Sequence, residues 1–249
     1  VFNSLNSNQV EILLGMWGGT TGKLWWDNLR VEPDPTVNLI RRSDLPVSLM
    51  SQGGTRYTEG LDFIPVVDRQ LGNYEYAGAY GWDHEGPEVR LMPNSRIQDG
   101  ETVLFSGYHA LPVFGDQVNA ALTTPGVLDL VDTIIENVAQ DLNPSSYFFR
   151  HDEIRAGGWE PSETAFPTTG AALAENLRRA HQAVETLGGD RPVYIWSDMV
   201  DPYGNAVEHF FAVNNTIAGA WEGLDQETII VNWNYDSPVD SFQFFDAQG

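Results

Sequence analysis

The chain has 249 residues, of which 42% are hydrophobic and 12% aromatic, so it can bury a sizeable core in one large domain or two smaller ones. Its formal net charge of −22 disfavours binding to nucleic acid or to anionic membrane surfaces. The absence of cysteine excludes disulfides, zinc–thiolate sites and thiol nucleophiles. No apolar run approaches the ~20 residues of a membrane-spanning helix, so we expect no membrane insertion.

The first part of the chain is expected to be all-β. Residues 1–33 contain two partly alternating stretches, VEILLGMWGG and GKLWWDNLRVE, which flank a turn rich in glycine and threonine and indicate an antiparallel hairpin. Residues 34–100 continue in short β-like pieces that Gly, Asn, Asp and Pro separate, without a helical period. We therefore predict a β-sandwich-like N-terminal region, made of terminal strands at 1–33 and a small β region at 34–100.

In residues 101–249, predicted strands alternate with predicted helices. The strands are expected at 102–110, 145–154, 192–199, 217–223 and 228–235. The helices are expected at 125–142 with Thr124 as N-cap, at 169–187, at 205–213 and at 237–248. This alternation implies a parallel sheet, either doubly wound or part of a (β/α)₈ barrel. Because the sequence opens within a strand and closes within a helix, we also expect a piece of a longer protein.

Polar side chains gather at the carboxyl ends of successive predicted strands. In chain order they are His109, Asp152, Glu153, Asp198, Glu222, Asn232 and Asn234. Ligands bind at this edge in α/β folds, and (β/α)₈ enzymes place their catalytic groups there. No glycine-rich phosphate-binding loop follows a strand, which weighs against a nucleotide-binding fold. The sequence therefore favours an incomplete (β/α)₈ barrel of the TIM type over residues 101–249.

Aromatic side chains lie beside the same strand ends. An aromatic ring next to carboxylates is typical of a sugar site, because the C–H face of a pyranose stacks on the ring. A carboxylic acid with a raised pKa can protonate a glycosidic oxygen while a second carboxylate stabilises the developing positive charge. We predict Glu153 as the general acid and Asp152 as its partner, with Asp198 and Glu222 as further candidate carboxylates.

The remaining candidates are predicted to bind the substrate. They are His109, His151, Arg155, Trp159, Trp196, Trp221, Asn232, Trp233 and Asn234. Because neither the H-x-H nor the H-E-x-x-H spacing is present, we predict no metal and no cofactor. Simpler interpretations stay open: the acidic pair can form surface ion pairs with Arg150 and Arg155, Asp198 can cap a helix, and each Trp can belong to the core.

Several of these motifs resemble a known group of proteins. The stretch LGMWGGTTGKLWWDNLRVE resembles the closing strands of a jelly-roll carbohydrate-binding module. The motifs HDEIR, VYIWSDMVDPYGNA, AGAWEGL and IIVNWNY together resemble large secreted bacterial proteins with a glycosidase-type barrel. More distantly, the chain is similar to glycoside hydrolase family 20, the β-N-acetylhexosaminidases. The resemblance implies a secreted or cell-surface protein that hydrolyses O-glycosyl bonds of a carbohydrate, with Glu153 as acid and Asp152 orienting the 2-acetamido group.

The sequence departs from the family 20 pattern at two places. Arg150 and His151 precede the acidic pair where that family usually has Gly-Gly, and the strand before Asn232 ends without a carboxylate. Either the substrate supplies the nucleophile, or Asp198 or Glu222 does so, or the chemistry has been lost. In the last case the protein is a non-catalytic carbohydrate-binding or scaffold protein with a degenerate barrel.

Overall fold

The computed structural model describes residues 9, 11–12, 18, 21–27, 34–82, 84–113 and 118–248. The chain divides into two compact units, Val1–Gln117 and Val118–Gly249. The terminal strands expected at 1–33 lie largely outside the described residues, and the described stretch 21–27 contains no strand.

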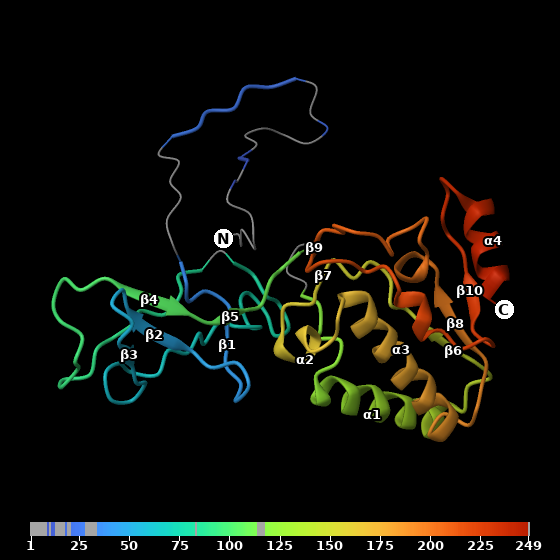
Figure 1. Cartoon of the computed structure of the whole chain (residues 1–249), viewed down its shortest axis with the longest axis horizontal. Coiled ribbons are helices and arrows are strands. Elements are labelled where there is room, and N and C mark those ends of the chain that lie inside the picture. Colours follow the sequence, from blue (N-terminus) through green and yellow to red (C-terminus); the bar gives the residue numbers. More distant parts are fainter. Residues whose placement is uncertain are drawn as a thin grey trace. The chain divides into compact units, whose positions relative to one another are not determined.

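The first unit is built from short antiparallel strands (Figure 1). Strand β1 (Leu39–Ile40) pairs with β5 (Tyr108–His109), and β2 (Ser48–Ser51) lies between β3 (Arg56–Tyr57) and β4 (Val103–Ser106). In the region where we expected a β-sandwich, the described residues form one sheet of two strands and one of three. The sandwich itself stays a prediction.

The strands β4 and β5 come from the stretch that we assigned to the parallel sheet. They belong instead to the antiparallel pairs of the first unit, because Phe105 lies opposite Leu49 and packs against the core of that unit. This core consists of Leu39, Leu49, Tyr57, Phe63 and Val66. The chain consequently divides into its two units between residues 117 and 118, whereas we expected the α/β region to begin at residue 101.

A buried carboxylate ties the loops of the first unit together. Asp62 accepts hydrogen bonds from Arg96 Nη2 at 2.6 Å, from Arg96 Nε at 2.9 Å and from the Thr58 N–H at 2.6 Å. The hydrogen bonds from Arg96 are the main reason why the pKa of Asp62 lies well below its usual range. This carboxylate is therefore a structural anchor between the segment that follows β3 and the segment that precedes β4.

The second unit contains a parallel sheet, as expected from the alternation of strands and helices. Strands β6 (Tyr147–Phe149), β8 (Val193–Trp196) and β10 (Ile229–Val231) run parallel, with β8 in the middle. Strands β7 (Ala156–Gly157) and β9 (Ala212–Val213) form a separate parallel pair. Among the described residues the strands do not close into a barrel. The unit is thus a mixed α/β structure, and the incomplete barrel stays a prediction.

The helices of the second unit begin and end close to the predicted positions. Helix α1 (Pro125–Leu142) starts directly after Thr124 and ends before Asn143, whose φ of 42° is left-handed. Helix α3 (Thr169–Thr186) is capped by the Thr168 hydroxyl, which accepts the Ala171 N–H at 3.0 Å. The short helix α2 (Pro161–Thr164) precedes α3, and α4 (Pro238–Gln248) follows β10. In Figure 1, α1 runs beside α3, in agreement with the contacts between them.

Two predicted elements differ from the structure. The helix expected at 205–213 is a loop that ends in β9, because His209 and Phe211 adopt left-handed φ values of 58° and 44° that a right-handed helix excludes. The strand expected at 217–223 ends instead in the 3₁₀ helix η2 (Ala220–Gly223), which follows the 3₁₀ helix η1 (Asp198–Val200) in chain order. Tertiary contact with α3 replaces sheet pairing in this segment.

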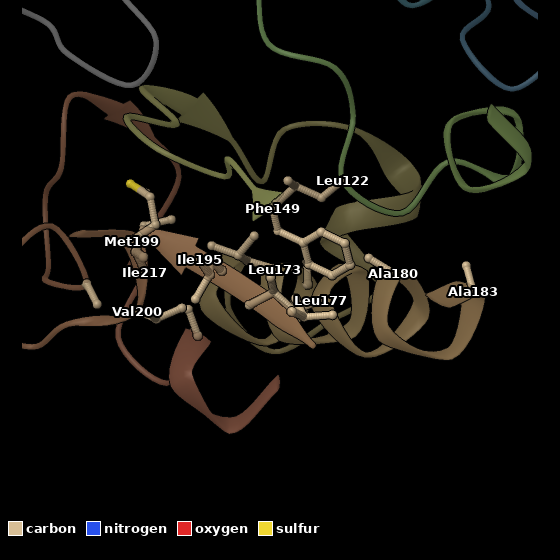
Figure 2. Close-up of a cluster of buried hydrophobic side chains, with 14 of the residues drawn as sticks. Leu122, Phe149, Leu173, Leu177, Ala180, Ala183, Ile195, Met199, Val200 and Ile217 are labelled. Carbon is tan, nitrogen blue, oxygen red and sulfur yellow. The ribbon is translucent and has the colours of Figure 1, made fainter. Parts of the chain in front are cut away.

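The core of the second unit lies between the sheet and α3. Figure 2 shows Phe149 of β6 and Ile195 of β8 among Leu173 and Leu177 of α3. Alternate strand residues face opposite sides of a sheet, so Phe148, Tyr194 and Trp196 lie on the other side. This confirms the predicted alternation in β8, where Val193 and Ile195 are buried and the two aromatic residues are half-buried.

The contact between η2 and α3 depends on glycine. A Cβ atom added to Gly223 would lie 2.2 Å from the Ala174 carbonyl oxygen, so the two backbones would have to separate. We expect Gly223→Ala to lower the free energy of unfolding by about 1–3 kcal/mol. Gly126→Ala in α1 is the matched control, because its Cβ would meet nothing within 4 Å.

Denaturant unfolding followed by far-ultraviolet circular dichroism measures this difference, because every helix from α1 to α4 belongs to the second unit. Equal unfolding midpoints for Gly223→Ala and the wild type would show that the close approach is not required.

Candidate functional site

The carboxyl ends of β6, β8 and β10 meet at one edge of the central sheet. Several hydrogen bonds join the segments that follow these strands. The Glu153 N–H donates to Asp198 Oδ2 at 2.9 Å, and the Ser197 hydroxyl donates to Asn232 Oδ1 at 3.4 Å. The parallel arrangement therefore brings together polar residues that are far apart in the sequence, as such sheet edges commonly do.

A pocket of about 350 Å³ opens at this edge. It combines carboxylates, side-chain amides and aromatic rings. It is lined by Glu153, Ser197, Asp198, Tyr203, Gly204, Asn205, Trp233, Asn234, Tyr235 and Asp236.

Asp198 is the buried carboxylate of this pocket, with 5% of its surface exposed. Its Oδ2 accepts the Glu153 N–H at 2.9 Å and the Asn205 side-chain amide at 3.0 Å. Its Oδ1 is buried and finds no hydrogen-bond partner among the described residues. Burial raises the pKa of Asp198, and the negative charge of Asp152 raises it further. Because Oδ2 is occupied by two donors, Oδ1 is the oxygen free to carry a proton.

The predicted acid Glu153 has a different environment. Its side chain is 45% exposed, and Glu153 Oε1 lies 2.7 Å from Arg155 Nη2. Asp152 Oδ1 lies 3.7 Å from Arg150 Nε, and the Arg150 side chain is 81% exposed. Both carboxylates thus form the ion pairs that we considered as the simpler interpretation. The backbone of Glu153 is left-handed, with φ of 51°, and Asp198 holds it there through the N–H.

His151 directly precedes the acidic pair in the sequence and does not line the pocket. The Asn176 side-chain amide donates to the Leu122 carbonyl at 2.6 Å, so Asn176 Oδ1 faces His151 Nε2, at 2.8 Å. Since that oxygen can only accept, Nε2 carries the hydrogen. Burial lowers the pKa of His151. The neutral imidazole therefore serves to link β6 to α3.

Two of the predicted aromatic platforms lie together at the site. The rings of Trp196 and Trp233 stack with centroids 5.4 Å apart and planes inclined by 28°. Phe148 meets Trp196 edge-on at 5.0 Å, on the sheet face opposite α3. Trp233 lines the pocket, so this aromatic cluster continues from the sheet face to the carboxylates.

The other predicted aromatic residues lie elsewhere. The indole N–H of Trp159 donates to the Ala212 carbonyl at 2.7 Å, which ties it to β9. Trp221 meets Phe244 of α4 edge-on at 5.3 Å. Trp221 and Glu222 line a different pocket, of about 240 Å³, so Glu222 is not brought next to Asp198 there.

Asn234 and Asp201 form a structural network next to the pocket. The Asn234 amide donates to Asp201 Oδ2 at 3.2 Å, to the Tyr203 carbonyl at 2.9 Å and to Ser241 Oγ at 2.9 Å. Asp201 is fully buried and also accepts the Ser241 hydroxyl at 2.6 Å and the Tyr203 N–H at 2.9 Å. These bonds connect the end of β10 with α4 and with the loop after η1.

The predicted site residue His109 belongs to the first unit. Its Nδ1 lies 2.7 Å from the Val37 carbonyl oxygen, next to the pairing of β5 with β1. This contact gives His109 a structural partner within its own unit.

Six pocket residues were not predicted from the sequence: Ser197, Tyr203, Gly204, Asn205, Tyr235 and Asp236. Tyr203 and Asn205 belong to the loop DPYGN, which directly follows η1. A loop rich in Asp, Pro, Gly and Asn after a parallel strand is a signal for a binding loop, and it could have identified both residues. Asp236 likewise lies in the loop that follows a parallel strand, directly after the motif NWNY at the end of β10.

The described residues contain no group of three or more His, Cys, Asp or Glu side chains that could hold a metal ion. In the same part of the chain, no helix has the length and apolar character needed to cross a membrane. In comparisons with known proteins, no family model and no curated protein matches this sequence. The resemblance to glycoside hydrolases therefore remains a hypothesis.

Asp198 and Asp201 are both buried aspartates, but they should respond differently to replacement by asparagine. In Asp198→Asn the remaining side-chain oxygen can take the place of Oδ2 and keep both N–H donors. The new NH₂ group then takes the place of Oδ1, which has no partner among the described residues. Asp201→Asn must turn its amide group toward a donor, because both oxygens of Asp201 accept hydrogen bonds. We expect a loss of about 1–3 kcal/mol for Asp201→Asn and none at neutral pH for Asp198→Asn.

The pH dependence adds a second test of Asp198. Its native pKa lies above the ordinary value of 3.8, so the native state binds more protons between these two values. Wild-type stability therefore falls as pH rises through this window, whereas Asp198→Asn lacks that contribution. Unfolding titrations from acidic to neutral pH measure the difference. A strong destabilisation of Asp198→Asn at neutral pH would contradict the assignment.

Proposed function

We propose that the protein acts on carbohydrates as a glycoside-hydrolase-like enzyme, with its site in the pocket at the ends of β6, β8 and β10. The observation that carries this proposal is the buried carboxyl group of Asp198, whose pKa is raised by burial. A carboxylic acid that keeps its proton to a higher pH than an ordinary aspartate is suited to the protonation of a glycosidic oxygen.

In the proposed reaction, the carboxyl group of Asp198 donates its proton to the glycosidic oxygen. The bond between this oxygen and the anomeric carbon breaks, and the positive charge develops on the sugar ring. Glu153, which lines the same pocket, is the second carboxylate that faces this charge. Water then adds to the anomeric carbon, and its proton returns to a carboxylate of the site, so that hydrolysis is complete.

The aromatic cluster supports a sugar as the ligand. Trp233 lines the pocket and stacks on Trp196, so one indole face lies beside the carboxylates. Stacking of a pyranose C–H face on such a ring positions the sugar without requiring charge. The resemblance to secreted bacterial glycosidases adds a cell-surface or extracellular location to the proposal.

The proposed roles differ from those expected from family 20. That resemblance implied Glu153 as acid and Asp152 as the group that orients a 2-acetamido substituent. Glu153 is exposed and paired with Arg155, whereas Asp198 is enclosed, so the environments favour Asp198 as the proton donor. Asp152 influences the site through its charge, which raises the pKa of Asp198.

A second candidate function is carbohydrate binding without catalysis. It is favoured by Asn232 at the end of β10, where no carboxylate is present, and by the Arg partners of Asp152 and Glu153. In this case the pocket and Trp233 hold a glycan, and no bond is broken.

Hydrolysis of a panel of aryl glycosides and polysaccharides, N-acetylhexosaminides included, tests the proposal. We expect Asp198→Asn to lower turnover by roughly 100-fold or more, as the loss of a general acid does. Glu153→Gln should also lower turnover. Asp246→Asn is the matched control, because Asp246 is exposed on α4 outside the pocket.

Three other results would overturn the proposed roles. Full turnover in Asp198→Asn together with its loss in Glu153→Gln would assign the acid to Glu153. Sugar binding without turnover on any substrate would favour the second candidate. Neither binding nor turnover would contradict both functions.

A further inference from the structure

The charges of the pocket bear on the kind of sugar that it accepts. Its lining includes three carboxylates, those of Glu153, Asp198 and Asp236, and no Lys, Arg or His is among the described residues that line it. At neutral pH the exposed carboxylates leave the pocket with negative charge. A ligand that carries a carboxylate or sulfate would be repelled there.

The amide groups of the pocket are occupied within the protein. The Asn234 amide donates to Asp201, Tyr203 and Ser241. The Asn205 amide donates to Asp198 Oδ2 at 3.0 Å. An anionic substituent needs several donors or a cation to replace its water shell, and these side chains already use theirs internally.

The positively charged residue nearest in sequence to the pocket lining is Arg155, and it already forms an ion pair. Arg155 Nη2 lies 2.7 Å from Glu153 Oε1, and the Arg155 guanidinium also lies over the Phe211 ring at 5.5 Å from its centroid. Arg155 does not line the pocket. It offsets the charge of Glu153 and leaves the charge of Asp236 without an equivalent partner in the lining.

We propose that the pocket selects uncharged or amine-bearing sugars and excludes uronic acids and sulfated sugars, with Asp236 as a specificity-determining residue. The proposal rests on the proposed function, because it assumes that the pocket binds sugar. The Asp236 N–H donates to Asn234 Oδ1 at 3.1 Å, which holds this residue at the pocket while its side chain is exposed.

Calorimetric binding of three matched ligands tests the selection: methyl glucoside, methyl glucosaminide and methyl glucuronide. We expect the wild type to bind the glucoside and glucosaminide and to bind the glucuronide at least tenfold more weakly at low salt, with the difference shrinking as salt screens the charges. Asp236→Lys should raise glucuronide affinity relative to glucoside on the order of tenfold. Asp246→Lys on α4 changes the net charge equally and should leave the ratio unchanged.

The outcomes separate this proposal from the one on which it depends. Glucuronide binding as tight as glucoside binding, or an unchanged ratio in Asp236→Lys, would overturn the selection while leaving carbohydrate binding intact. If none of the three ligands binds, and polysaccharides do not bind either, the proposed function fails and the selection fails with it.

Discussion

A buried carboxylate that accepts a backbone N–H from the neighbouring strand end organises the site. Asp198 Oδ2 binds the Glu153 N–H and the Asn205 amide, so it fixes the segment after β6 and the loop after η1 at the same time. The cost is a carboxylate held away from water, which raises its pKa. The hydrogen bonds from Glu153 and Asn205 lower this pKa, so the burial of the carboxylate, and not these contacts, makes Asp198 the candidate acid. Parallel pairing holds the ends of β6 and β8 side by side, and α3 packs on one face of this sheet against Phe149 and Ile195.

Much of the second unit could be predicted from local sequence signals. Thr124 and Pro125 mark the start of α1, and the glycines at 188 and 189 follow the end of α3, because caps and helix breakers act within a few residues. Strand alternation in VYIW likewise predicts which side chains enter the core. The gathering of polar residues at the strand ends follows from the parallel sheet, so the pocket lies at the edge where it was expected.

Features that depend on tertiary contacts could not be predicted in this way. The sequence of an isolated Asp-Glu pair does not show which carboxylate of the site is enclosed. In the structure Asp198, at the start of η1, is buried, whereas Glu153 pairs with Arg155. The segment AGAWEG has the composition of a strand. Instead it ends in the 3₁₀ helix η2, in which Gly223 packs closely against Ala174 of α3. From sequence alone, the segment that forms β4 and β5 could equally be the first strand of the α/β region. Only its antiparallel pairing with β2 and β1 assigns it to the first unit.

Asp198 should keep its proton to a higher pH than an ordinary aspartate. Its titration can be measured directly by carboxyl carbon NMR on the protein labelled at aspartate, with Asp198→Asn assigning the signal. We expect a titration midpoint above the ordinary value of 3.8. Asp152→Asn should lower this midpoint, because a neighbouring negative charge is removed. A midpoint at or below the ordinary value would contradict the proposed role of Asp198, since the pocket would then lack its proton donor.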